Sequence, residues 1–234
     1  MLFEATINLL LCCLLFLLFS LQVSGQSVSS RIEADFTIKE KDANGKLGLT
    51  KGTVYYDKDI KKLVYKVVFP GKEVVVFSDT LVYRTVNGKY SSKRASGMAV
   101  KFSIFHLALN HNLQYFGLNA SKYEMVDIRK ENGLTVSTWL PEKEYREYMG
   151  KIVLSQKDNK LDGLISYGPD GTVIAKQFFR NYTKSGLIEF PQNVYEFNYL
   201  QGVETKKTME YSNIVLDKQE NEEYYNYPVT INNN

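Results

Sequence analysis

The sequence predicts a mainly β protein: one large antiparallel sheet of about ten or eleven strands, curled or closed, with one interrupting helix. Aromatic residues make up 13% of the chain, including 17 Tyr and 13 Phe, and such residues favour strands. Short apolar runs recur between hairpin-turn signals, and one stretch is clearly helical. No Gly-, Ser- or Pro-rich linker divides the chain, which predicts a single domain.

The first 25 residues are predicted to be a cleaved secretory signal peptide, leaving residues 26–234 as the mature domain. Residues 9–23 are almost purely apolar, and small residues follow at the expected cleavage site. The segment lacks Lys and Arg and carries Glu4, so the alternative is an uncleaved anchor. That alternative is weaker because the apolar run is shorter than the roughly 20 residues that a span needs. We therefore expect a periplasmic or secreted protein.

Both cysteines, Cys12 and Cys13, lie within that apolar run. The mature domain would then be an exported protein without disulfides, held together by packing alone. Neither cysteine is placed where a lipoprotein signal would have it, which disfavours a lipid anchor. The formal net charge is +3 and the charges are interspersed, so we expect no nucleic-acid binding.

The first strands and a central meander follow the signal segment. Residues 30–39 alternate between apolar and polar, turn at residues 42–45, and residues 47–56 return as a second strand. The meander continues to residue 86 and ends at Asn87-Gly88, a strong hairpin signal. Connections this short make neighbouring strands antiparallel.

Residues 74–77 of the meander, V-V-V-F, are apolar on both faces. An antiparallel sheet with one wet face should alternate cleanly, so something is expected to cover the second face. A helix, a curled sheet or a bound apolar ligand would each serve.

Residues 98–110 are the helical stretch. Ser103, His106 and Asn110 cluster on one side, and the remaining surface is apolar. The segment can be an ordinary core helix or a lid across an apolar concavity, and at 13 residues it is too short to span a bilayer.

Strands resume after the helix and continue to about residue 213. In the strand at residues 194–200, we expect Tyr195, Phe197 and Tyr199 to face inward and Glu196 and Asn198 to face solvent.

Four segments, in this order, resemble the LolA-like family of periplasmic lipoprotein carriers. The first is G-T-V-Y-Y-D-K at residues 52–58 with L-V-Y-K-V-V-F-P at 63–70. The second is V-V-F-S-D-T-L-V-Y at 75–83, where the turn is two residues tighter than in the family. The third is D-G-L-I-S-Y-G-P-D-G-T-V-I-A-K-Q-F-F-R-N-Y at 162–182 with Phe190-Pro191, and the fourth is Y-Y-N-Y-P-V at 224–229.

The resemblance implies a half-open barrel whose concave side holds helices and receives the acyl chains of lipoproteins or other lipids. It also implies contacts with envelope transport proteins. The family's cavity Arg, which locks the lid, corresponds to Lys58 here, whose point charge cannot form a planar fork. The family's long N-terminal helix has no counterpart, because strand pattern begins soon after Gln26.

Each acyl methylene buried in a dry cavity contributes about 0.8 kcal/mol, so a 16-carbon chain contributes on the order of 10 kcal/mol before ordering costs. The residues expected to line such a cavity, for each of which ordinary core packing is the alternative, are Lys58, Tyr65, Val67, Phe69, Val76, Tyr83, Phe102, Phe105 and Leu109.

No catalytic motif, metal-ligand pattern or cofactor fingerprint occurs, so we expect a non-enzymatic monomer without cofactor or metal. Two other functions stay open. One is an exported structural or interaction protein of the cell envelope without a ligand. The other, disfavoured by lysines on both strand faces, is an outer-membrane barrel.

Overall fold

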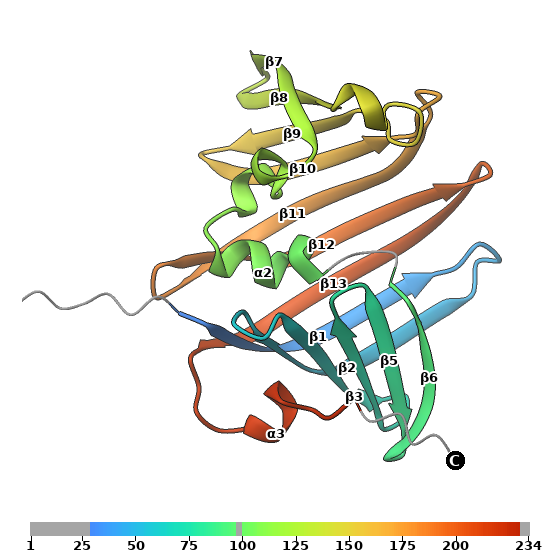
Figure 1. Ribbon diagram of the computed structural model, residues 1–234, viewed down its shortest axis with the longest axis vertical. Helices are drawn as coiled ribbons and strands as arrows, with labels where there is room; N and C mark the ends of the chain where they lie inside the picture. Colours follow the sequence, from blue (N-terminus) through green and yellow to red (C-terminus); the bar gives the residue numbers. More distant parts are fainter. Residues whose placement is uncertain (1–28, 97–99, 230–234) are drawn as a thin grey trace, which may run out of the picture.

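The computed structural model describes residues 29–96 and 100–229, and the predicted signal peptide lies outside this part of the chain. The described residues form one antiparallel sheet of 13 strands in the order β6-β5-β4-β3-β2-β1-β13-β12-β11-β10-β9-β8-β7. The sheet is strongly curved and does not close into a barrel (Figure 1). The predicted fold class is therefore confirmed.

The strands are bounded as follows: β1 Arg31–Lys41, β2 Leu47–Asp57, β3 Lys62–Phe69, β4 Glu73–Ser78, β5 Leu81–Val86, β6 Lys89–Ala95, β7 Tyr123–Glu131, β8 Leu134–Pro141, β9 Ile152–Lys157, β10 Lys160–Tyr167, β11 Val173–Ser185, β12 Ile188–Leu200 and β13 Val203–Leu216. The helical elements are η1 Val100–Phe102, α2 Ile104–Leu109, η2 Leu113–Tyr115, η3 Leu118–Ala120, η4 Lys143–Tyr145 and α3 Glu222–Tyr225. All but η4 and α3 belong to the segment between β6 and β7.

The strand number exceeds the predicted ten or eleven. One strand that the sequence did not reveal is β6, whose seven residues are all exposed and carry no apolar alternation. It is specified by its hairpin with β5, in which the turn residues Asn87 and Gly88 both have positive φ. The hairpin turn that pairs β6 with β5 therefore makes it a strand, without any contribution from burial.

One face of the sheet carries the main core. On β1, Ile32, Ala34 and Phe36 are buried at alternate positions, and α2 packs over them. We call this the inner face and the opposite one the outer face. Gly52 on β2 permits the close approach of β3 at a shift in register, since a Cβ there would lie 2.0 Å from the Lys66 carbonyl oxygen.

The predicted facing of β12 is wrong. Val194 belongs to the inner core and is paired with Phe179 of β11, which is also buried there. Because side chains alternate, Tyr195, Phe197 and Tyr199 point to the outer face and Glu196 to the inner one. The alternation of side chains along β12 fits either facing of the strand. Only the pairing with β11 shows which side chains point to the inner face.

The predicted helix is real but interrupted. Ser103 separates η1 from α2, with extended backbone and a side-chain oxygen that accepts a hydrogen bond from the His106 N–H at 3.2 Å. A Ser in this position is a strong helix start signal. The regular helix therefore covers six residues rather than thirteen. Within the described residues, no helix is long and apolar enough to cross a bilayer.

Candidate site: a cleft beside helix α2

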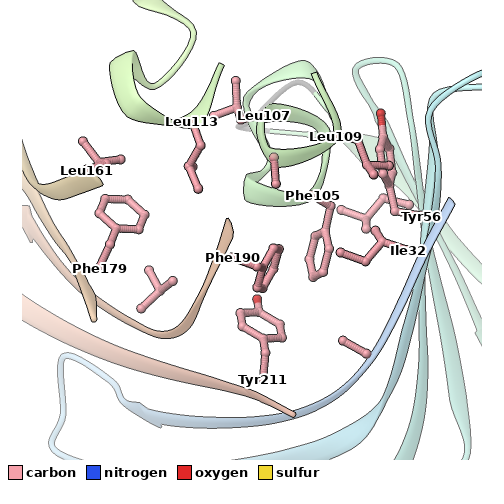
Figure 2. Packing of buried hydrophobic residues seen from close by; sticks show 14 of the residues in the cluster. Ile32, Tyr56, Phe105, Leu107, Leu109, Leu113, Leu161, Phe179, Phe190 and Tyr211 are labelled. Carbon is pink, nitrogen blue, oxygen red and sulfur yellow. The ribbon is translucent and has the colours of Figure 1, made fainter. Parts of the chain in front are cut away.

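Helix α2 lies across the middle of the inner face and is anchored by its own sequence. Phe105 points from the helix toward Phe190 on β12 and Tyr211 on β13, with ring centroids 5.2 and 5.3 Å away (Figure 2). Leu107, Ala108 and Leu109 are also buried. The apolar surface predicted for this segment thus packs as core.

A polar contact fixes the orientation of α2. The Tyr56 hydroxyl on β2 lies 2.6 Å from Nδ1 of His106. Burial lowers the pKa of His106, and the positive charges of Lys61 and Lys58 lower it further. The imidazole is therefore neutral near pH 7, and its Nδ1 can accept the Tyr56 hydrogen.

A cleft of about 530 Å³ opens at the C-terminal end of α2, and we call it the end cleft. It is bounded by the end of α2, the β11–β12 turn, the last residues of β13 and the start of the described chain. Its walls combine apolar side chains with polar groups and are formed by Ser29, Leu109, His111, Ser185, Gly186, Leu187, Ile188, Ile214, Val215 and Leu216.

A second cleft of about 190 Å³ adjoins the end cleft and shares His111 and Leu187 with it. Its lining is more polar and includes Gln114, Asn159, Lys160 and Glu189. Leu187, 61% exposed, lies between the two clefts. An apolar floor with a polar side compartment suits a ligand with an apolar body and a polar end.

The structure brings together four of the predicted cavity residues. Tyr65 and Val67 of β3 and Phe105 and Leu109 of the helical segment all belong to, or pack against, the inner core. Of these, Leu109 also lines the end cleft. Burial raises the pKa of Tyr65 to about 12 and that of Tyr211, its hydrogen-bond partner, still further.

The other five predicted residues lie elsewhere. Val76 and Tyr83 are on the outer face, Phe69 is 48% exposed at the end of β3, and Phe102 is half-buried in η1. Lys58 donates a hydrogen bond to the Ser29 carbonyl oxygen at 3.1 Å, so in this structure it ties down the start of β1 rather than α2.

Most residues of the end cleft were missed by sequence reasoning. Ile188, Ile214 and Leu216 are ordinary strand residues in sequence, and only the meeting of β11, β12 and β13 at one end of the sheet groups them. The available signal was Ser185-Gly186, a turn followed at once by two apolar residues, of which Leu187 stays exposed.

The two-sided apolar run at residues 74–77 is explained by the C-terminal segment, not by a ligand. Val76 packs on the outer face with Tyr55, Val64 and Tyr225 of α3, and Val74 packs against this cluster. The Tyr224 ring stacks on Tyr55 at 5.1 Å. The sequence left open whether a helix, a curled sheet or a bound apolar ligand covers this run, and the structure shows a helix.

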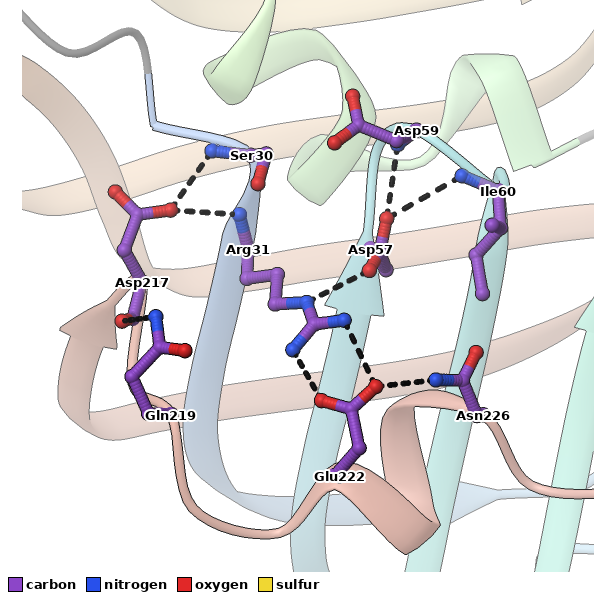
Figure 3. A network of polar contacts seen from close by, with 9 residues as sticks. All are labelled: Ser30, Arg31, Asp57, Asp59, Ile60, Asp217, Gln219, Glu222 and Asn226. Carbon is purple, nitrogen blue, oxygen red and sulfur yellow. Dashed lines mark hydrogen bonds and ion pairs between the residues drawn. The ribbon is translucent and has the colours of Figure 1, made fainter.

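An ion-pair cluster fastens α3 to the sheet (Figure 3). Arg31 Nε donates to Asp57 Oδ2 at 2.7 Å, and its two terminal nitrogens contact the carboxylate of Glu222. The guanidinium carbon also lies 4.7 Å from the Tyr225 ring centroid. Arg31 thus supplies the planar guanidinium contact that Lys58 cannot form. This contact holds α3 on the outer face, not α2 on the inner face.

Among residues 29–96 and 100–229, no group of three His, Cys, Asp or Glu side chains is placed to hold a metal ion. The chemistry that the end cleft offers is apolar contact at its floor and hydrogen bonding at its side compartment.

Solved structures share this architecture. A LolA superfamily protein from Nitrosomonas europaea aligns with a TM-score of 0.56 at 10% identity, covering 84% of this chain and 90% of that one. A DUF1329 family protein from Desulfovibrio piger aligns with a TM-score of 0.58 at 14% identity, covering 85% and 90%. The chain has a LolA-like fold.

A domain assigned to outer membrane lipoprotein sorting, from Vibrio parahaemolyticus, aligns with a TM-score of 0.51 at 12% identity, covering 86% of this chain and 91% of that one. No family model and no curated protein sequence matches the chain. At these identities the likeness to the LolA-like structures establishes the fold, and the ligand must be argued from the residues.

Proposed function

We propose that this protein is an exported, non-enzymatic carrier or binder of acyl chains, carried by lipoproteins or other lipids, in the end cleft of its LolA-like sheet. The observation that carries the proposal is the cleft of about 530 Å³ beside α2, walled by Leu109, Ile188, Ile214 and Leu216. This volume falls within the range of about 300–1,000 Å³ that is typical of small-molecule sites.

The hydrophobic effect supplies the affinity. Each methylene that leaves water for the cleft contributes about 0.8 kcal/mol. Eight buried methylenes would contribute roughly 6 kcal/mol before the cost of ordering the ligand. The more polar side compartment would receive the head of a lipid or the peptide end of a lipoprotein.

Helix α2 would act as a movable wall of this site. Only six residues long, it joins the rest of the inner core by side-chain packing and the contact between His106 and Tyr56. Displacement of α2 would open the apolar surface of Tyr65, Val67 and Phe105 to a longer chain. In the closed position, the end cleft is the entry to that surface.

A fluorescent fatty-acid titration tests the proposal, and Leu187→Asp is the decisive variant. Leu187 borders both clefts, so a carboxylate there should weaken probe binding about 10-fold, the loss expected when an apolar contact becomes a desolvated charge. An extrinsic probe is needed because the single Trp139 is buried on β8, outside both clefts.

Leu200→Asp is the matched control, because Leu200 is an exposed hairpin leucine at the other end of β12. It should bind the probe as the unmodified protein does. Equal losses of probe affinity in both variants, or no saturable binding by the unmodified protein, would refute the proposal that the end cleft binds acyl chains.

The second candidate is an exported interaction protein of the cell envelope without a ligand. The dense packing of α2 against Phe190 and Tyr211 favours it, since most of the inner face is filled. This alternative predicts that the protein leaves a lipid extract with no lipid bound in native mass spectrometry.

A further inference from the structure

The hairpin between β12 and β13 exposes apolar side chains at its tip. Leu200 is 75% exposed and Val203 44% exposed on either side of the turn Gln201-Gly202. Leu187 lies at the other end of β12, roughly 40 Å away at the rise of an extended strand. Figure 1 shows the two turns at opposite ends of the sheet, so this tip is separate from the end cleft.

Behind the tip, a row of basic and apolar side chains crosses the outer face. The strand register places Leu47 opposite Lys41, Lys41 opposite Lys206, Lys206 opposite Phe197 and Phe197 opposite Lys176. We call Lys41, Lys176 and Lys206 the lysine row. Leu47, at the start of β2, is 77% exposed and extends the apolar surface to a second hairpin.

Within the described residues, the lysines of the row are not ion-paired, although Glu204 lies two residues from Lys206 on the same face of β13. Lys176 and Lys206 instead lie over the rings of Tyr199 and Phe197, with Nζ 5.4 and 5.5 Å from the centroids. The direct opposition of Lys41 and Lys206 costs stability in the free protein, and an anion placed between them would offset that cost.

The order of chemistry along the hairpin matches the depth profile of a bilayer interface. Leucine and valine come first and the Tyr199 ring follows, and the lysines lie level with the Phe197 ring in the next outward-facing row. Apolar side chains partition toward acyl chains, aromatic rings favour the interfacial region, and lysines attract anionic headgroups. Nucleic acid would match the lysines but would leave Leu47, Leu200 and Val203 without an apolar phase.

We propose that the β12–β13 tip and the lysine row dock this protein onto the surface of a bilayer that contains anionic phospholipid. The docking surface lies at the end of the sheet opposite the end cleft, so it does not depend on ligand binding there. Glu204, the one carboxylate between Asn198 and Lys207, opposes docking from within the hairpin.

Co-sedimentation of the mature protein with vesicles tests this proposal. We expect binding to phosphatidylglycerol–phosphatidylcholine vesicles, weaker binding to pure phosphatidylcholine, and loss of the difference at high salt. The double variant Lys41→Ala/Lys206→Ala should bind the anionic vesicles about 10-fold more weakly or worse. It should also unfold at the same or a higher temperature, because two opposed like charges are gone.

Further variants distinguish membrane docking from a general effect of positive charge and from ligand binding in the end cleft. Leu200→Asp should weaken vesicle binding, and Glu204→Gln should strengthen it. Lys89→Ala/Lys130→Ala removes two exposed lysines elsewhere and should bind vesicles normally. Leu187→Asp should also dock normally even if it loses the fatty-acid probe.

Three results would overturn the proposal: equal binding to anionic and neutral vesicles, an equal loss in the Lys89/Lys130 control, or preference for an oligonucleotide over vesicles.

Discussion

At the scale of single residues, His106 makes the stability of the protein depend on pH. Its folded-state pKa lies below the usual 6.5 because burial and the nearby Lys58 and Lys61 disfavour the charged form. The unfolded chain therefore binds the proton more tightly, and stability falls as pH drops below about 6.5 toward the folded pKa.

The measurement is thermal unfolding between pH 7.5 and 5. His106→Gln should be less stable at pH 7.5 and should lose the part of the pH dependence that arises from this group. An unchanged pH profile in that variant would contradict the role given to the imidazole.

Tyr225 offers a second prediction at this scale. Its ring is buried in the outer cluster, and its hydroxyl is buried without a hydrogen-bond partner among the described residues. A buried unsatisfied hydroxyl costs about 1–3 kcal/mol, so Tyr225→Phe should leave stability unchanged or raise it. Urea unfolding checks this, and a clear loss of stability would show that the hydroxyl has a partner in solution.

At the scale of elements, the attachment of α3 depends on Arg31 more than on Glu222. Arg31→Met leaves the buried Asp57 carboxylate without its ion pair and should cost about 2 kcal/mol or more in unfolding free energy. Glu222 is largely exposed, so Glu222→Gln should lower the free energy of unfolding less than Arg31→Met does. The reverse order in chemical denaturation would contradict this account.

The elements also show what sequence can predict. The hairpins at Asn87-Gly88 and Asn132-Gly133 were predictable because positive φ at these residues is a local property. The start of α2 at Ser103 is also local. In contrast, β6 and the facing of Tyr195 depend on neighbouring strands, and the cover over Val76 comes from residues about 150 positions away. A short stretch of sequence does not contain these long-range pairings and contacts.

At the scale of the whole molecule, the sheet separates two surfaces. The inner face is core under α2 and opens at the end cleft, whereas the outer face is covered by α3 over β2–β4 and carries the lysine row over β1 and β11–β13. Four of the residues expected to line an apolar concavity lie in or against the inner core, and one of these, Leu109, also borders the end cleft. The sequence could not locate the opening, because the end cleft forms where three strand ends meet.

Photo-crosslinking with a diazirine fatty acid tests whether an acyl chain occupies the end cleft, as we propose. Peptide mapping should place the label on residues 185–188, on residues 214–216, or beside Leu109 at the end of α2, with competition by unlabelled fatty acid. Labelling confined to the β12–β13 tip, or spread over the outer face without competition, would contradict this proposal.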